Sequence, residues 1–342
     1  MSRIQIVPLT QWITEAALQH GSSLPAHLMQ RLAINRRQAG QLLKKLVVLQ
    51  WLNAMGTPRI PLYGPGALRQ VVRRYTLARL EEGGAWRRDF AAAFTLPAAV
   101  QRMAQHAFTE LLNNAVDHSG GSSVTVSMRQ TPLQLQLLVS DDGCGLFDRI
   151  AQSFHVGEPI AAMLELSKGK LTSAPERHSG HGLFFTSRLA DVCDIHANKA
   201  HFQCWASDGS VWRVGRPGPV AARSGTSVYL AMALDTPRTL DAVLQAHSRS
   251  GEGYDFSRTR VPLKLLASDD SVLASRADAR RVASGLQRFA SAEIDFDGIV
   301  DIGHGFADEL FRVFGRSQSA LTLLPVGMAP RVAAMVGSVQ HG

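Results

Sequence analysis

The sequence predicts a multidomain α/β (α+β) protein, in which a central α/β sandwich is flanked by a small helical domain and a small α/β domain. Its 342 residues are 45% hydrophobic, which is enough for two or three cores of the usual domain size of about 100–150 residues. Apolar residues recur with helical spacing in residues 9–49 and alternate as in strands at 124–128 and 133–137. Residues 259–340 then read as alternating strands and helices.

Composition favours a cytoplasmic protein with no membrane partner. No run approaches the roughly 18–20 apolar residues of a membrane span. The first residues, MSRIQIVPLTQW, lack the basic-then-apolar pattern of a signal peptide. The three cysteines, Cys144, Cys193 and Cys204, lack metal-binding spacing and are odd in number, so reduced thiols are expected.

Positive charge is concentrated at the N-terminal end. The chain carries a formal net charge of +8, and residues 1–78 hold ten basic residues against one acid, Glu15. The remainder is close to balance. A basic excess confined to one end predicts an acidic partner for that end, most simply nucleic acid.

Residues 1–80 read as three helices followed by a hairpin. Two helices are expected at 9–20 and 24–34, and Asn35 is a suitable N-cap for a third. The third helix, Arg36 to Leu49, has a stripe of apolar residues, with its basic residues mostly off that stripe. A turn at Asn53 to Pro58 and a short strand, 59–63, complete the pattern.

This pattern, carried by R31-L-A-I-N-R-R-Q-A-G-Q-L-L-K-K-L-V-V-L-Q-W-L-N53 and the hairpin, resembles a winged helix-turn-helix. In that family the third helix enters the major groove and the wing touches the backbone. The resemblance implies DNA binding through residues 1–80. A small helical interaction domain with a solvated basic face remains the alternative. The candidate DNA contacts are Arg36, Arg37, Lys44, Lys45 and Arg59.

The central region is expected to be a sandwich of helices on a mixed sheet. Residues 67–80 and 85–95 are expected to be helical connectors, and 148–180 show little periodicity. The other expected elements are helices at 98–118, 182–190 and 237–248, and strands at 124–128, 133–137, 193–197, 200–206, 211–214 and 226–231.

The helix at 98–118 carries a carboxylate and a carboxamide four residues apart, Glu110 and Asn114. This spacing puts both head groups on one helical face, which they share with His106 and Asp117. An amide oxygen can hold Mg²⁺, while a carboxylate can accept a proton from water or a hydroxyl. Taken alone, an amphipathic surface helix explains the same pattern.

Three Gly-containing motifs follow in order. In D-D-G-C-G, Asp141 ends a strand and can accept the exocyclic amine of adenine, while glycines allow a tight turn close to a ligand. S-G-H-G-L opens a helix, whose free N–H groups and dipole favour phosphate. G-T places the Thr226 hydroxyl at a strand start, near the expected adenine pocket. Each motif alone is also compatible with an ordinary turn or helix cap.

Together, E-L-L-N-N-A-V-D-H-S, D-D-G-C-G, S-G-H-G-L and G-T resemble the GHKL ATPases over about residues 98–232. This implies a Bergerat-type sandwich, residues 81–247, that binds ATP and Mg²⁺ under a lid at 148–180. By resemblance, Glu110 is the general base, Asn114 the Mg²⁺ ligand and Asp141 the adenine acceptor. The other implied ATP contacts are Gly143 and Gly145 at the base and sugar, Gly180, His181 and Gly182 at the phosphates, and Thr226 in support of Asp141.

The sequence departs from the family in several respects. S-G-H-G-L lacks a second G-x-G, no phospho-acceptor helix precedes the motifs, and His106 lies only one turn from Glu110. The short lid is closer to that of the anti-sigma-factor serine kinases. Lid residues Lys168, Lys170 and Arg177 are expected either to reach phosphates or to be solvated.

Residues 255–342 contain S-R-A-D-A-R-R and D-F-D-G-I-V-D-I-G-H-G-F-A-D-E-L-F-R-V-F, which resemble the STAS-like domain of unknown function. A helix is expected at 276–289, strands at 294–302 and 322–326, and a helix from Gly303. STAS domains are partners of GHKL serine kinases, which implies a protein partner. STAS substrates carry a serine where this chain has Gly303-His304-Gly305, so phosphorylation in cis is not expected there.

These observations predict a cytoplasmic ATP/Mg²⁺-binding regulator, either a nucleotide-gated, DNA-binding transcriptional regulator or a component of a partner switch, and a homodimer. One alternative is a serine/threonine protein kinase of the anti-sigma-factor type that acts on a separate STAS partner. Another is a slow nucleic-acid-associated ATPase. The sequence leaves open whether ATP is hydrolysed, transferred or only sensed.

Overall fold

The computed structural model describes residues 5–57, 59–154, 157–171, 180–209, 211–215, 224–266 and 273–340. The chain forms two compact units. Unit 1 comprises residues 1–142 and 227–237, and unit 2 comprises residues 143–226 and 238–342. Both units combine helices with strands, which confirms the predicted α/β class.

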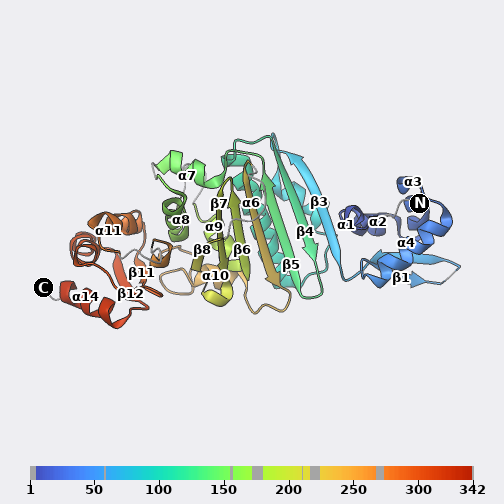
Figure 1. Cartoon of the computed structure of the whole chain (residues 1–342). Coiled ribbons are helices and arrows are strands. Elements are labelled where there is room, and N and C mark those ends of the chain that lie inside the picture. The colour runs from blue at the N-terminus through green and yellow to red at the C-terminus, as the bar shows by residue number, and fades with distance from the viewer. Residues whose placement is uncertain are drawn as a thin grey trace. The chain divides into compact units, whose positions relative to one another are not determined.

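Unit 1 begins with a small helical bundle and a hairpin (Figure 1). Its core is formed by apolar side chains from all the larger elements, including Ile13, Leu28, Leu46 and Trp51. Asn35 caps the third long helix through a reciprocal capping box with Gln38, as its position predicted. The elements are α1 (Val7–Thr10), α2 (Ile13–His20), the 3₁₀ turn Gly21–Ser23, α3 (Leu24–Leu32), α4 (Arg36–Val48), β1 (Leu52–Gly56) and β2 (Pro61–Pro65).

The hairpin differs from the prediction in where it turns. Residues from Asn53 onward were expected to form a turn, but they belong to β1, which pairs antiparallel with β2. The tight turn lies between Thr57 and Ile60, whose backbone groups exchange hydrogen bonds of 3.2 and 3.1 Å. Pro58 lies outside the described residues.

The second part of unit 1 is an antiparallel sheet with a long helix packed against it. The strands pair in the order β3-β4-β5-β9, and helix α6 contacts β5. Residues 67–80 were expected to be helical, and this prediction is wrong for β3, where Val71 pairs with Met128 of β4. The elements are β3 (Arg69–Thr76), α5 (Glu82–Ala85), the π-helix Trp86–Phe90, α6 (Ala98–His118), β4 (Ser123–Gln130), β5 (Gln134–Asp141) and β9 (Thr226–Ala233), which starts at the boundary of unit 2.

The first part of unit 2 contains a three-stranded antiparallel meander, β6-β7-β8, and the predicted lid. The lid lacked periodicity in the sequence, yet its described residues include two helices, α7 and α8. A four-residue stretch of α8, Ala161–Leu164, is buried throughout, so no amphipathic pattern was available. The elements are α7 (Leu146–Phe154), α8 (Pro159–Lys168), α9 (Gly182–Leu189), β6 (Val192–Ala197), β7 (Ala200–Trp205), the 3₁₀ turn Ala206–Asp208, β8 (Val211–Val214) and α10 (Leu240–Gln245).

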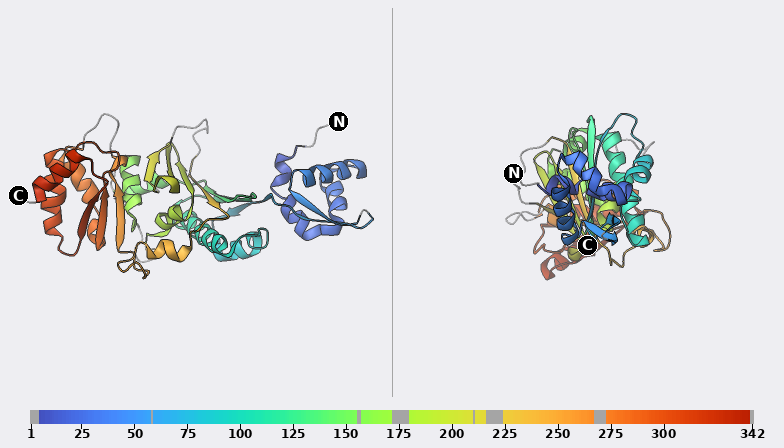
Figure 2. Two further views of the ribbon diagram at one scale, coloured as in Figure 1. Left: turned by 90° about the horizontal axis from the view of Figure 1, so that it is seen from below. Right: turned by 90° about the vertical axis from the view of Figure 1, so that its right-hand side faces the viewer.

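The C-terminal part of unit 2 is a parallel three-stranded sheet, β10-β11-β12. Strands β11 and β12 lie between α14 on one side and α8 on the other, as Figures 1 and 2 show. The strand expected at 294–302 ends at Asp295, and the helix expected to reach 289 ends at Ala283. The elements are β10 (Arg258–Pro262), the 3₁₀ turn Leu263–Leu265, α11 (Arg276–Ala283), the 3₁₀ turn Leu286–Arg288, β11 (Ser291–Asp295), α12 (His304–Ala307), the π-helix Asp308–Phe314, α13 (Gly315–Ser317), β12 (Thr322–Val326) and α14 (Pro330–Gln340).

Two further expectations are tested by the structure. All three cysteines are free thiols, and Cys193 and Cys204 are buried. Among the described residues, no helix has both the length and the apolar character needed to cross a bilayer.

Candidate functional site

Helix α6 positions the predicted base and the predicted Mg²⁺ ligand. Its buried face includes Phe108, whose ring packs at centroid distances of 5.3 Å from Trp86 and 5.1 Å from Phe90. These aromatic contacts fix the rotation of the helix about its axis. Glu110 and Asn114 lie on another face and are half-buried, so a carboxylate and a carboxamide share one partly shielded patch, as the i,i+4 spacing predicted.

His106 lies one turn before Glu110 on the same helix. Its Nε2 atom is buried and has no hydrogen-bond partner. Burial lowers the pKa of this imidazole, although the nearby Glu110 carboxylate opposes the shift. The structure therefore places a buried imidazole nitrogen without a hydrogen-bond partner one helical turn from the candidate base.

Asp141 is the last residue of β5, the strand against which α6 packs. It is only 8% exposed. Its neighbour Asp142 holds the strand end in place. The Asp142 carboxylate accepts hydrogen bonds of 2.7–2.9 Å from the backbone N–H and hydroxyl groups of Ser122 and Ser123. These bonds hold the pKa of Asp142 well below its usual range. The two aspartates therefore have different roles: Asp142 is structural, and Asp141 is the buried carboxylate.

The glycine turn that follows belongs to unit 2 and is tied to the Gly-Thr motif. The backbone N–H of Leu146 donates to Thr226 Oγ1 at 2.9 Å, and Ser224 Oγ donates to the carbonyl of Gly143 at 3.0 Å. Gly145 has φ +90°, a conformation that side-chain-bearing residues rarely adopt. The structure thus brings together Gly143, Gly145 and Thr226, which are far apart in sequence.

Asn198, which sequence reasoning missed, is the centre of this junction. Its amide donates to the Cys144 carbonyl at 2.8 Å and to the carboxylate of Asp148, while its oxygen accepts from Gly225 N–H at 3.1 Å. It lies directly against Gly145, where a Cβ would collide with its amide. Asn198 has φ +52°, in the left-handed region that asparagine tolerates better than most residues. The tight β6–β7 turn, Asn198-Lys199, was the only signal for it in the sequence.

The predicted phosphate segment is described from Gly180 onward. His178, Ser179 and the candidate Arg177 lie outside the described residues. Gly180 has φ +71°, and a Cβ there would come within 2.6–2.8 Å of the Leu171 backbone. Only glycine fits this close approach. His181 and Gly182 then begin α9, where both are half-buried.

The His181 ring does not point freely into solvent. It packs edge-on against Phe256 at a centroid distance of 4.8 Å. Burial and the positive charge of Lys170 lower the pKa of His181 to about 4, so the ring is neutral near pH 7. Any contribution of this residue to phosphate binding is therefore through its backbone N–H rather than through an imidazolium.

The two lid lysines have partners in the C-terminal part of unit 2. Lys168 is 2% exposed and its Nζ donates to Glu165 at 2.7 Å and to the carbonyls of Arg281 and Ser284 at 2.9 Å each. Lys170 Nζ donates to a carbonyl of the same region at 2.7 Å and lies 4.4 Å from the centroid of a phenylalanine ring. Both expectations for Lys168, phosphate contact and full solvation, are wrong, because its three donor positions are occupied in a buried site.

The predicted residues fit ATP and Mg²⁺ in the chemistry of their groups. Mg²⁺ prefers oxygen ligands, which the patch on α6 offers, and a purine amine needs a fixed acceptor, which a buried aspartate provides. Gly145 and Gly180 pack so closely against the Asn198 amide and the Leu171 backbone that a side chain at either position would collide. Glu110, Asn114 and Asp141 belong to unit 1, and Gly143, Gly145, Gly180, His181, Gly182 and Thr226 belong to unit 2.

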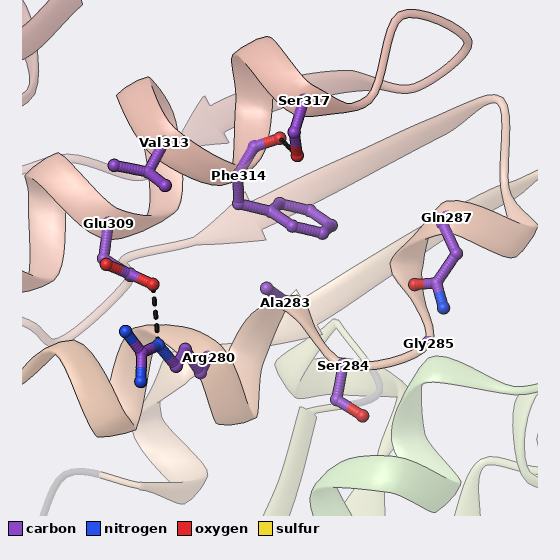
Figure 3. Close-up of a pocket in the computed structure, with 9 residues that line it drawn as sticks. All are labelled: Arg280, Ala283, Ser284, Gly285, Gln287, Glu309, Val313, Phe314 and Ser317. Carbon is purple, nitrogen blue, oxygen red and sulfur yellow. Dashed lines mark hydrogen bonds and ion pairs between the residues drawn. The ribbon is translucent and has the colours of Figure 1, made fainter.

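A separate cavity of about 310 Å³ lies in the C-terminal part of unit 2 (Figure 3). Among its lining residues, the Arg280 guanidinium donates to Glu309 at 2.7 Å. None of its residues was a predicted site residue. The lining is Arg280, Ala283, Ser284, Gly285, Gln287, Glu309, Val313, Phe314 and Ser317.

Comparisons with known families agree with two of the regions. Residues 74–205 match the family model of the histidine kinase-like ATPase domain, and residues 278–330 match that of the STAS-like domain of unknown function. A search of curated proteins found no match. The first match contains every predicted ATP contact except Thr226. Domains of this kind bind ATP, usually with Mg²⁺, and the two matches together suggest an ATP-binding regulator or a protein like the anti-sigma-factor kinases.

Proposed function

We propose that this protein is an ATP-binding regulator in which the lid passes the state of the nucleotide site to the STAS-like region. The observation that carries the proposal is the junction at Asn198, which joins the glycine turn to the Gly-Thr motif inside a region that matches the ATPase family. A turn built this way is preorganised, so little conformational entropy is lost when a ligand binds.

Each predicted residue has a proposed role. Asn114 would hold Mg²⁺, which supplies charge neutralisation at the phosphates. Glu110 would accept a proton from the attacking water or hydroxyl, and Asp141 would accept the adenine amine. Gly143 and Gly145 would contact the base and sugar of ATP through their backbone. The backbone of Gly180, His181 and Gly182 would contact the phosphates. Thr226 would support Asp141 at the adenine end.

The lid is physically joined to the STAS-like region within unit 2. Besides the bonds of Lys168, the Thr259 hydroxyl on β10 donates to the Lys168 carbonyl at 2.6 Å. Arg288 donates to the Lys170 carbonyl at 3.0 Å. The C-terminal end of α8 is therefore held by both its side chains and its backbone. A change in the lid on ATP binding would alter these bonds, which gives the STAS-like region a direct route to sense the nucleotide.

The N-terminal bundle supports a role in DNA binding. The candidate residues Arg36, Arg37, Lys44, Lys45 and Arg59 are all exposed. α4 buries Ala39, Leu42 and Leu46 instead, so its basic residues are available to a partner. We propose that the bundle is a winged helix that places α4 in the major groove. A homodimer would give it two half-sites, which is the usual arrangement for this geometry.

A second candidate function is a serine/threonine kinase that acts on a separate STAS protein. The observation that favours this kinase is the start of α12, where Gly303 is the N-cap and His304 is the first residue. No hydroxyl occupies the position at which STAS substrates are modified, so a phosphate acceptor would have to be supplied by another chain. Transfer would use Glu110 as the base toward the incoming hydroxyl.

The proposed function is tested by nucleotide binding and by following the fate of labelled phosphate from ATP on the purified full-length chain. Asp141→Asn is expected to abolish ATP binding, because the amide has no negative charge and one acceptor oxygen where the carboxylate has two. Glu110→Ala is expected to bind ATP and Mg²⁺ and to lose any turnover. Asp235→Asn, an exposed position on the same unit, serves as the matched control and should behave as wild type.

The product distinguishes the candidates. Binding without turnover, accompanied by a change in DNA affinity, supports the gated regulator. Labelled STAS partner supports the kinase, and free phosphate alone supports a slow ATPase. Wild-type protein that binds no ATP, or an Asp141→Asn variant that binds it unchanged, would refute the nucleotide site.

A further inference from the structure

The outer face of the β6–β7 hairpin carries a cluster of three side chains that the nucleotide site does not use. His196 and His201 are cross-strand partners, and Asp194 pairs with Gln203 two residues further along the strands. Side chains separated by two residues lie on the same face of a strand. Their buried neighbours, such as Cys193 and Ile195, take the opposite face.

The atoms of this cluster converge on one point. Nε2 of His196 lies 3.1 Å from Asp194 Oδ1, and Nε2 of His201 lies 2.7 Å from the same oxygen. The two imidazole rings stack with centroids 3.6 Å apart. All three candidate ligand atoms lie within 4.8 Å of one another. In a tetrahedral zinc site with bonds of about 2.0–2.2 Å, neighbouring ligand atoms are about 3.3–3.6 Å apart, which is close to the spacing here. Binding would also rotate the two stacked rings until the plane of each contains the ion.

A further residue supports the carboxylate. Gln203 Nε2 donates to the second oxygen of Asp194 at 2.8 Å, which orients Oδ1 toward the histidines. Hydrogen bonds of this kind, from neighbours to metal ligands, are typical of real metal sites. Gly215 packs against the ring of His201, where a Cβ would collide with it. The side chains of Asp194 and His201 are 18% and 11% exposed, whereas that of His196 is 39% exposed, which leaves one open side for an ion to enter.

We propose that Asp194, His196 and His201 bind a Zn²⁺ ion, with water in the fourth position. Two imidazoles and one carboxylate match the ligands of zinc rather than the all-oxygen set preferred by Mg²⁺. The site would therefore be distinct from the Mg²⁺ that accompanies ATP. Because the ion would cross-link β6 and β7, its binding would also stabilise the hairpin whose turn holds Asn198.

The proposal is tested with ZnCl₂ alone, on tag-free, full-length protein freed of metal by a chelator. Isothermal titration and metal analysis after dialysis are expected to give one tightly held Zn²⁺ per chain. His196→Ala and Asp194→Asn should each fail to retain this Zn²⁺ ion. His304→Ala, which removes an exposed histidine from the same unit, should retain it and so controls for adventitious zinc binding by histidines.

Gln203→Ala separates a metal site from a purely hydrogen-bonded cluster. It keeps all three ligands and is expected to weaken Zn²⁺ binding by about 10–100-fold. The visible d–d absorption of Co²⁺ should report a tetrahedral site in wild type and disappear in His196→Ala. Circular dichroism checks that each variant folds. If wild type holds no Zn²⁺ beyond what His196→Ala holds, the cluster is only a hydrogen-bonded one and the proposal is wrong. That result would not refute the proposed nucleotide site, because none of the three zinc ligands is a proposed ATP contact.

Discussion

Positive charge serves opposite purposes in two regions of the molecule. On α4, Arg36 and Lys44 are exposed, and the buried face of that helix is apolar. At the end of α8, Lys168 is buried and Lys170 is held by a carbonyl and by aromatic rings. In the sequence both regions are simply paired basic residues beside an apolar stretch. Whether a cation is available to a ligand is decided by acceptors that arrive from distant parts of the chain.

The largest effect is expected from Lys168→Ala. It would leave a half-buried carboxylate, Glu165, and two backbone carbonyls without their donor. Removing one partner of a buried ion pair typically costs about 3–5 kcal/mol, so the free energy of unfolding should fall by about that amount. Urea unfolding followed by tryptophan fluorescence and circular dichroism measures it.

Lys199→Ala, at an exposed lysine in the same unit, is the control and should change stability by less than about 0.5 kcal/mol. Equal effects of the two substitutions would show that Lys168 is not the anchor of α8. Lys168→Met should recover part of the loss, because it keeps most of the buried volume of the side chain while removing the charge.

A smaller effect of a different kind is expected from the double substitution Arg36→Ala/Arg37→Ala. Stability should hardly change, since both side chains are exposed. Affinity for a labelled random-sequence DNA duplex should fall by about tenfold or more, because two positive charges that would neutralise phosphates are removed. The slope of log affinity against log salt should shrink by about 2.

The matched control is Arg316→Ala/Arg331→Ala, which removes the same charge from exposed positions in the STAS-like region. It should leave DNA affinity intact. Unchanged DNA binding in the Arg36/Arg37 variant would refute the winged-helix proposal and would favour a protein partner for the bundle.

The smallest effect is expected from Lys170→Met, which should change the pKa of His181 and the pH dependence of stability. Because the pKa of His181 is about 4 in the fold and 6.5 for an ordinary histidine, the unfolded chain binds more protons between those values. Stability should therefore decrease as pH falls from about 6.5 toward 4. Above pH 6.5, His181 should add no pH dependence to the free energy of unfolding. Removing the Lys170 charge should raise the pKa of His181 partway toward 6.5 and flatten this dependence, as an NMR titration of the ring would show. Burial, the larger cause of the shift, would remain.

Local signals predicted the elements on which the candidate site depends. The cap at Asn35 and the helix with Glu110 and Asn114 were readable because the relevant interactions lie within a few residues. The glycine turn at 143–146 was readable from its glycines, but the hydrogen bond that holds it is made to Thr226, 80 residues later. β3 was missed because its conformation depends on pairing with β4 about fifty residues later.

The same reason explains the missed residues of unit 2. Lys168 binds carbonyls more than a hundred residues away, and Asn198 bonds to a turn more than fifty residues before it. Neither has a local pattern that sets it apart from an ordinary surface lysine or a turn asparagine. Sequence reasoning therefore found the chemical groups of the site better than the residues that hold them in position.

The path of the chain through its two units imposes an order on biosynthesis. The chain leaves unit 1 after Asp142 and returns at Ser227, where β9 pairs with β5 along Gln134–Ser140. During synthesis, the β5 edge of the unit 1 sheet stays unpaired until β9 emerges from the ribosome. Exposed strand edges are prone to pair with the wrong strand. A ribosome that stalls between these two points would hold a nascent chain with its buried aspartate already made and its last strand missing. This interval is where we expect the chain to depend most on chaperones.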